Sequence, residues 1–220
     1  MNERTQAIFF DLDNCLFDTS AMKSMKLFDP IFQQIGTWGA DTTLKVMVER
    51  ALWNGAPQDT IGDMDYLTAG QRTDLLTWYD QLPVPEEAAL YTDSLPFLEA
   101  ISAKPNRPTL ILVTKGLNGF QRSKITHLGI ERFFDHIQIT GDAKWSAYET
   151  KYLAFGAFKQ RLGFANASCI AVGDSAHDEL LSGARLGMTT VQTVRPGVTP
   201  DPQTVRRITS LDQLWQYINI

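Results

Sequence analysis

Residues 8–18 read IFFDLDNCLFD, an apolar run that ends in two carboxylates, Asp11 and Asp13. Alternate side chains of a β-strand point to the same side, so a strand ending here can present both acids to one ligand. Two neighbouring carboxylates repel each other, and they are tolerated mainly where a cation neutralises them or where one holds a proton. The segment therefore indicates a catalytic site, although an ordinary Asx turn over DLDN would use the same residues.

The rest of the chain predicts an α/β fold. From Asp93 onward apolar strands alternate with helices, which is typical of a parallel sheet covered on both faces. Further strands are expected at 108–114, 136–140, 168–174 and 189–194, with helices at 95–103, 117–128, 152–162 and 178–186. Three of these helices end at glycines that suit C-terminal caps with positive φ, namely Gly129, Gly163 and Gly187. A last helix is expected from Ser210, with Gln213 completing a capping box.

The segment between the first two strands has a different character, because it contains amphipathic helical stretches and no strand pattern. One helix is expected behind Asp41 as N-cap, and another over 71–80. We therefore predict a three-layer, parallel-sheet, Rossmann-like core with a small α-helical cap domain inserted after strand 1. The core would comprise residues 1–17 and 92–220, and the cap residues 18–91.

Composition excludes several classes of function. The chain has 220 residues and a net charge of −5, without a basic stretch that could follow a nucleic-acid backbone. No apolar run reaches membrane-spanning length, and the N-terminal run is too short for a signal peptide, so we expect a cytoplasmic protein that acts on neither nucleic acid nor membrane. Cys15 and Cys169 are expected to be reduced, partly buried thiols. Nothing in the sequence indicates the oligomeric state.

Polar residues follow the expected strands at the edge where open α/β sheets bind their ligands. Asp174 and Asp178 follow one strand in GDSAHD, and Thr114 and Lys115 follow another in LVTKG. Four acids at two strand ends would make one negative site, which Mg²⁺ neutralises because it prefers carboxylate and carbonyl oxygens. The Thr114 hydroxyl and the N–H groups that start the next helix suit a phosphate oxygen, although Thr114 also fits a simple N-cap.

These motifs resemble the haloacid dehalogenase superfamily of phosphohydrolases, in the branch whose helical cap follows the first strand. DLDNCLFD resembles its first motif, LVTKG its second and GDSAHDELLSGARLGM its fourth, in the family's order and over nearly the whole chain. The resemblance implies hydrolysis of a small phosphorylated metabolite, of nucleotide or sugar phosphate type, through an aspartyl-phosphate. The cap would exclude bulk water and choose the substrate.

The resemblance also implies a role for each motif residue. Asp11 would be the nucleophile, while Asp13 would protonate the leaving alcohol and then deprotonate the attacking water. Thr114 would hold a phosphate oxygen, and Lys115 would either touch the substrate or remain solvated. Mg²⁺ would be held by a set of four residues: the carboxylates of Asp11 and Asp174, the main-chain carbonyl of Asp13, and Asp178 directly or through water.

The lysine of the third motif has two candidates. Lys151 is preferred, because it starts an amphipathic helix about one βα unit before GDS, where the family usually has this residue. Lys144 fits an exposed loop and is the alternative. Asn14 stands where many relatives carry Gly, which is a mild change because Asn tolerates unusual turn conformations.

The sequence also bears on alternative functions within this superfamily. Asp13 argues against halide displacement, because that reaction needs no proton for the leaving group. Phosphonate cleavage would need a Schiff-base lysine in the cap, where Lys23 or Lys26 are candidates, but surface lysines are far commoner than desolvated ones. A phosphomutase would use the same residues, and a catalytically inactive relative that binds a phosphorylated ligand would not need the full set. Cap aromatics that either stack a base or pack helices, with packing favoured, are Trp38, Trp53, Tyr66 and Trp78.

Overall fold

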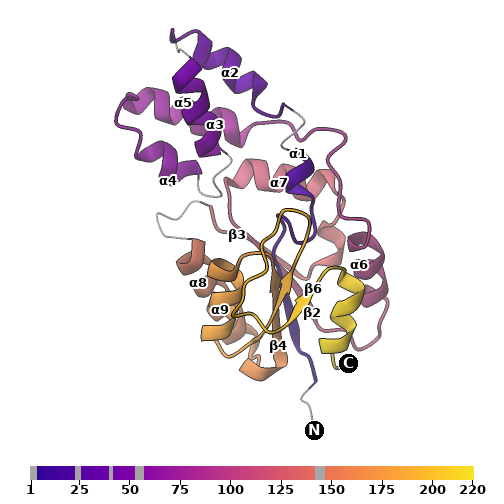
Figure 1. Cartoon of the computed structure of the whole chain (residues 1–220). Helices are drawn as coiled ribbons and strands as arrows, with labels where there is room; N and C mark the ends of the chain where they lie inside the picture. The colour runs from indigo at the N-terminus through magenta and orange to yellow at the C-terminus, as the bar shows by residue number, and fades with distance from the viewer. Residues whose placement is uncertain (1–3, 23–25, 40–41, 53–56, 142–146) are drawn as a thin grey trace.

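A parallel six-stranded sheet forms the centre of the molecule (Figure 1). The computed structural model describes residues 4–22, 26–39, 42–52, 57–141 and 147–220. The strand order is β3-β2-β1-β4-β5-β6. The strands are β1 (Ala7–Phe10), β2 (Thr109–Thr114), β3 (His136–Ile139), β4 (Cys169–Gly173), β5 (Thr189–Thr193) and β6 (Arg207–Ile208). The predicted α/β class and the first five strands are confirmed, whereas the two residues of β6 are too few to carry a sequence pattern.

Both faces of the central strands are buried, which explains why β1, β2 and β4 are apolar almost throughout rather than alternating. The outer strands β3 and β5 carry polar residues as well. Phe9 and Ile111 pack on one face against Phe155 and Phe158. The helices on this side are α8 (Ala147–Leu162) and α9 (Leu181–Arg185). Alternate strand residues belong to the other hydrophobic cluster, together with residues of α6 (Ser94–Ser102), α7 (Asn118–His127) and the 3₁₀ helix η4 (Leu211–Tyr217). Short 3₁₀ turns at η1 (Glu131–Phe133) and η2 (Asn166–Ser168) complete the connections.

Three helix C-termini agree with the sequence, whereas the start of α8 and the last helix differ from it. Gly129, Gly163 and Gly187 have φ of 62°, 70° and 68°, as their capping positions require. The last helix is 3₁₀ rather than α, and the predicted capping box is wrong in detail: Gln213 accepts the N–H of Thr209 instead of that of the N-cap residue. Buried leucines three residues apart fit a 3₁₀ helix as well as an α-helix, so the pattern did not separate the two.

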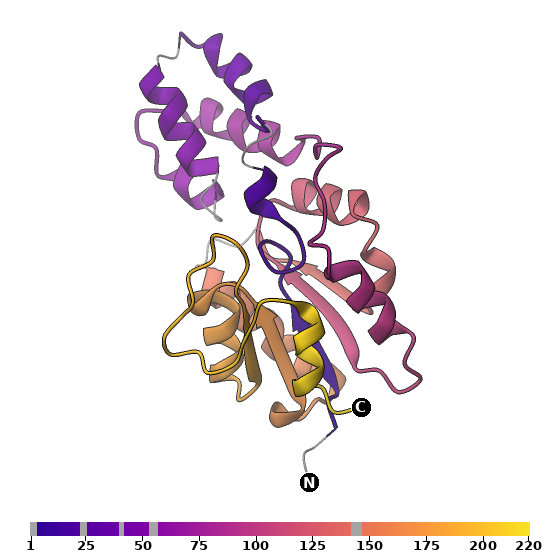
Figure 2. The same ribbon diagram turned by 45° about the vertical axis from the view of Figure 1, so that its right-hand side comes forward.

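The remaining helices gather beyond one end of the sheet, as the two views in Figures 1 and 2 show. They are α1 (Thr19–Met22), α2 (Asp29–Gly36), α3 (Thr42–Leu52), α4 (Pro57–Gly62) and α5 (Ala69–Asp80). Ile31, Ile35, Val48 and Leu75 are buried among them. The predicted N-cap Asp41 and the aromatic Trp53 lie outside the described residues.

The chain passes between the sheet and these helices at two adjacent points. Phe17 and Leu90 form an antiparallel bridge, and the Tyr91 N–H donates to the Leu16 carbonyl at 3.0 Å. The outgoing and returning segments therefore lie side by side.

No helix in the described part of the chain is long and apolar enough to cross a membrane.

Candidate active site

The carboxyl ends of the central strands bring three predicted site residues to one edge of the sheet. Asp11 directly follows β1, Thr114 ends β2, and Asp174 directly follows β4. The Asp11 N–H donates to the Val172 carbonyl at 3.0 Å, which continues the ladder between β1 and β4 and fixes the start of the acidic loop. The topology predicted from sequence thus accounts for the meeting of residues that are far apart in the chain.

A buried ion-pair network lies at this edge. The Lys151 Nζ of α8 donates to Asp11 Oδ1 and to Glu179 Oε2, each at 2.7 Å. The side chains of Lys151, Asp11 and Glu179 are only 4%, 7% and 1% exposed. Asp174 joins them, since ligand atoms of Asp11, Asp174 and Glu179 all lie within 4.8 Å of one another. One ammonium group therefore bonds two carboxylates directly, and a third carboxylate lies close to both of them.

Burial and the excess of negative charge shift the pKa values of these groups. Burial raises the pKa of Asp11 well above its ordinary value, and the nearby carboxylates add to that rise, while the Lys151 ammonium opposes it. Burial, followed by the charge of Glu179, raises the pKa of Asp174 to about 7. Burial alone would lower the pKa of Lys151, but the carboxylates of Asp11 and Glu179 outweigh it and raise that pKa. The network favours an additional cation.

Asp13 is held separately from this network. Its Oδ1 accepts hydrogen bonds from Thr19 Oγ1 at 2.6 Å and Lys124 Nζ at 2.7 Å. Its Oδ2 accepts from Gln121 Nε2 at 3.0 Å and from the same lysine at 2.9 Å. Burial opposes ionisation, but the charge and hydrogen bonds of Lys124 lower the pKa of Asp13 below its ordinary value. Neither Gln121 nor Lys124 was assigned a role from the sequence.

Thr114 fits the anion-binding role expected of it. Its side chain is fully buried, and its Oγ1 makes no hydrogen bond within the described residues. A buried hydroxyl without a partner is costly, so a ligand oxygen at this position would satisfy it. Lys115 is half-buried, and its carbonyl accepts from Gln121 Nε2 at 2.6 Å. Asn14 has a φ of 53° and donates to Asp174 Oδ2 at 3.4 Å, in line with its tolerance of unusual turns.

The structure does not bring every predicted residue to the cluster. Asp178 is half-buried and is not part of the carboxylate group around Asp11, whereas its neighbour Glu179 is. Glu179 also accepts the Ser175 N–H at 2.6 Å. Lys144, the alternative motif lysine, lies outside the described residues, as does Lys23.

Glu179 is a member of the acidic cluster that the sequence did not predict. It belongs to a π-helical turn, η3 (Ala176–Leu180), which replaces the α-helix expected from residue 178. Such turns often occur at functional sites. The sequence signal for Glu179 was its place directly after Asp178, as a second acid in the same motif. The buried Lys151 needs such a counter-charge.

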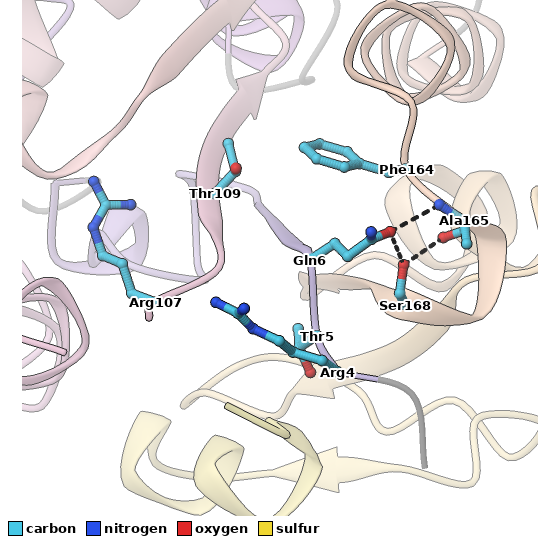
Figure 3. Close-up of a pocket in the computed structure, with 8 residues that line it drawn as sticks. All are labelled: Arg4, Thr5, Gln6, Arg107, Thr109, Phe164, Ala165 and Ser168. Atoms are coloured by element: carbon cyan, nitrogen blue, oxygen red, sulfur yellow. Dashed lines mark hydrogen bonds between the residues drawn. The ribbon is translucent and has the colours of Figure 1, made fainter. Parts of the chain in front are cut away.

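A pocket of about 590 Å³ lies at the opposite edge of the sheet (Figure 3). Gln6, Thr109 and Ser168 line it, and these residues stand at the amino ends of β1, β2 and β4. The Gln6 Oε1 accepts the Ala165 N–H at 2.9 Å and the Ser168 hydroxyl, as the dashed lines in Figure 3 show. Because the acidic cluster follows the carboxyl ends of the same strands, this pocket is separate from it.

A parallel sheet with carboxylates after β1 and β4, and a buried lysine between them, is the arrangement that the resembled superfamily leads one to expect. The chain belongs to this family: the family described as haloacid dehalogenase-like hydrolase matches residues 5–187. Among curated proteins, no sequence matches the chain.

Solved structures with the same fold include proteins with different activities. A HAD phosphatase from Thermococcus onnurineus has 20% identity and a TM-score of 0.69, over 98% of this chain and 100% of that one. The HAD-hydrolase YfnB from Bacillus subtilis, solved bound to magnesium, has 16% identity and a TM-score of 0.67, over 99% and 100%. A 2-haloacid dehalogenase from Pseudomonas syringae pv. tomato has 18% identity and a TM-score of 0.62, over 96% of each chain. At these identities the likeness establishes the fold alone.

Proposed function

We propose that the protein is a Mg²⁺-dependent phosphatase that hydrolyses a small phosphomonoester through an aspartyl-phosphate on Asp11. The observation that carries this proposal is Asp13, a second carboxylate two residues after the nucleophile, held by four hydrogen bonds beside it. A leaving alcohol needs a proton, whereas a leaving halide does not, so Asp13 favours phosphate transfer.

The residues at the sheet edge suit a divalent cation. Asp11, Asp174 and Glu179 carry three negative charges against the single positive charge of Lys151, which leaves an excess that one Mg²⁺ would balance. The three clustered side chains offer carboxylate oxygens, which Mg²⁺ prefers. Asp11 and Asp174 would hold the ion together with the Asp13 carbonyl, and Asp178 would contribute through water. That YfnB was solved bound to magnesium supports the choice of metal.

The protein's own groups would divide the reaction as follows. A carboxylate oxygen of Asp11 attacks phosphorus as the bond to the leaving oxygen breaks. Asp13, which must enter this step protonated although Lys124 lowers its pKa, gives that oxygen a proton. The Thr114 hydroxyl donates to a phosphate oxygen. Water then attacks the aspartyl-phosphate while Asp13 accepts its proton, and inorganic phosphate leaves Asp11. When bound, Mg²⁺ would offset the charge between the anionic nucleophile and the anionic phosphate.

We also propose that residues 18–91 form a cap domain over the core of residues 1–17 and 92–220. The adjacent crossing segments support this division, since a motion there would move the helices as a group. The Asp80 Oδ1 of α5 accepts the Gly119 N–H at 2.6 Å, at the start of α7. This hydrogen bond joins the helical part to the core at a third place, besides the two crossing segments.

The substrate class is proposed as a nucleotide or sugar phosphate. The rings of Trp38 and Trp78 lie 5.3 Å apart and both pack against the hydrophobic core, which supports packing rather than base stacking for this pair. Phosphonate cleavage is the weaker alternative, because Lys26 is exposed in a turn with φ of 50° and lacks the desolvation a Schiff-base lysine needs.

The test is hydrolysis of p-nitrophenyl phosphate and of a panel of phosphorylated metabolites by the purified protein. Activity should require Mg²⁺, disappear with EDTA and return when Mg²⁺ is restored. Asp11→Asn should abolish it, whereas Asp212→Asn, at an exposed acid, should not. Absence of hydrolysis across the panel, or activity that survives Asp11→Asn, would refute the phosphatase proposal. Activity that survives EDTA would refute its metal dependence.

A further inference from the structure

The side chain of Lys124 is buried behind Asp13, on the face of α7 that points toward the acidic loop. It is 4% exposed, whereas that of Asp13 is 26% exposed. The ammonium lies 5.5 Å from the ring centre of Phe17 and 5.2 Å from that of Phe120. A buried ammonium needs a counter-charge, and here Asp13 supplies it through both of its oxygens.

Gln121 completes the contact from one turn earlier on the same helix. Residues three apart lie on the same helix face, so Gln121 and Lys124 reach the same carboxylate. Besides Asp13, Gln121 Nε2 bonds the Lys115 carbonyl at 2.6 Å, which ties the acidic loop to the loop after β2. The fit leaves no room for a side chain at Gly116, where φ is +148° and a Cβ would lie 2.5 Å from Gln121 Nε2.

We propose that Lys124 is a positioning residue that fixes the orientation of the Asp13 carboxyl group for proton transfer. The proposal rests on the proposed function. Lys124 does not itself reach the substrate, because it lies behind Asp13 and is the more buried of the two. The Asp13 carboxyl group can rotate about the bond that joins it to Cβ. The bonds from Lys124 of α7 to both of its oxygens restrict that rotation. Misplacement of a proton donor slows the step that needs the proton more than the steps that do not.

Two substrates with different leaving groups distinguish a positioning role of Lys124 from a general effect on the structure of the site. p-Nitrophenol leaves readily without a proton, whereas phenol is a much weaker acid and depends on the general acid. The kcat/KM value covers the reaction through leaving-group departure, so phenyl phosphate and p-nitrophenyl phosphate form a matched pair of probes. A merely structural role for Lys124 would lower both values by the same factor.

The experiment compares wild type, Lys124→Met and Arg122→Met on both probes with saturating Mg²⁺. Methionine keeps the length of the side chain and packs well against aromatic rings, and Asp13 retains access to water. Arg122 is exposed on the same helix, so its replacement controls for loss of positive charge. We expect Lys124→Met to lose about tenfold more kcat/KM on phenyl phosphate than on p-nitrophenyl phosphate, since general acids contribute far more than this in total. Arg122→Met should change neither value.

Equal losses on the two probes, or no loss, would overturn the positioning role. If the wild-type protein hydrolyses neither probe, the contact between Lys124 and Asp13 is tested instead by thermal unfolding of Asp13→Asn, Lys124→Met and the double variant. The proposed function itself fails only if the metabolite panel is not hydrolysed either. The double variant should melt at a higher temperature than the sum of the two single shifts predicts, because neither single variant keeps a matched pair. Additive shifts would show that Lys124 does not hold Asp13.

Discussion

Replacing Lys151 by methionine should destabilise the metal-free protein strongly, because one ammonium group serves two buried carboxylates. The Lys151 Nζ is 2.7 Å from both Asp11 Oδ1 and Glu179 Oε2. None of the three side chains is more than 7% exposed, so solvent screens these ion pairs little. Methionine fills similar space, and the change therefore removes the charge while retaining most of the packing.

The expected magnitude follows from the unpaired charges. Breaking a buried ion pair by removing one partner costs about 3–5 kcal/mol. For a protein of 150–250 residues, each kcal/mol lowers Tm by about 2–4 °C, so the whole shift should be roughly 6–20 °C. Because the pKa of Lys151 is raised above 10.5, its ammonium form and its stabilising effect are complete at neutral pH. Toward acid pH the partner carboxylates take up protons, so the difference between variant and wild type should shrink.

The assay is thermal unfolding in EDTA at about pH 7.5 and about pH 4.5, on either side of the range in which perturbed carboxyl groups titrate. Lys104→Met is the control, since Lys104 is exposed. A Tm within about 2 °C of wild type at neutral pH, or a shift that does not change with pH, would refute the reasoning. Kinetically, Lys151→Ala should lower kcat sharply while Lys144→Ala leaves it unchanged, and the reverse result would reassign the motif lysine.

Three further predictions concern stability. The pKa of Asp174, raised to about 7, means that its ionisation disfavours the folded state, so Tm in EDTA should fall as pH rises from about 6 to about 8. Mg²⁺ should then raise Tm more at the higher pH, and a pH-independent effect would contradict this. Gly183→Ala puts a Cβ 2.7 Å from the Ala171 Cβ and should destabilise by about 1–3 kcal/mol in urea, whereas Gly36→Ala meets open space and should not; equal midpoints would contradict the packing argument. Asp80→Ala removes the acceptor at the start of α7 and should lower stability by about 1 kcal/mol, while an unchanged urea midpoint would show that the contact contributes nothing.

The sequence was most informative where one physical requirement acts over several residues. The central strands β1, β2 and β4 are apolar because both of their faces are buried, and the capping glycines occur where φ must be positive. Strand order then brings Asp11, Thr114 and Asp174 to one edge without further information. By contrast, the contact of Lys124 with Asp13 depends on how α7 is rotated against the sheet. A lysine on an otherwise amphipathic helix does not reveal whether its ammonium group faces solvent or a buried acid.

The sequence could not predict which of the two adjacent acids, Asp178 or Glu179, points toward the buried Lys151. In an α-helix adjacent residues point in directions about 100° apart, so two neighbouring acids compete for the same inward position. The π-helical turn over Ala176–Leu180 changes the directions in which these side chains point. The apolar residues do not reveal this turn, since Leu180 is buried and its neighbour Leu181 is partly exposed. What selects Glu179 is the demand of the buried Lys151 for a second counter-charge, which comes from another helix. The identity of the inward acid is therefore a tertiary property, fixed only when α8 and β4 have packed together.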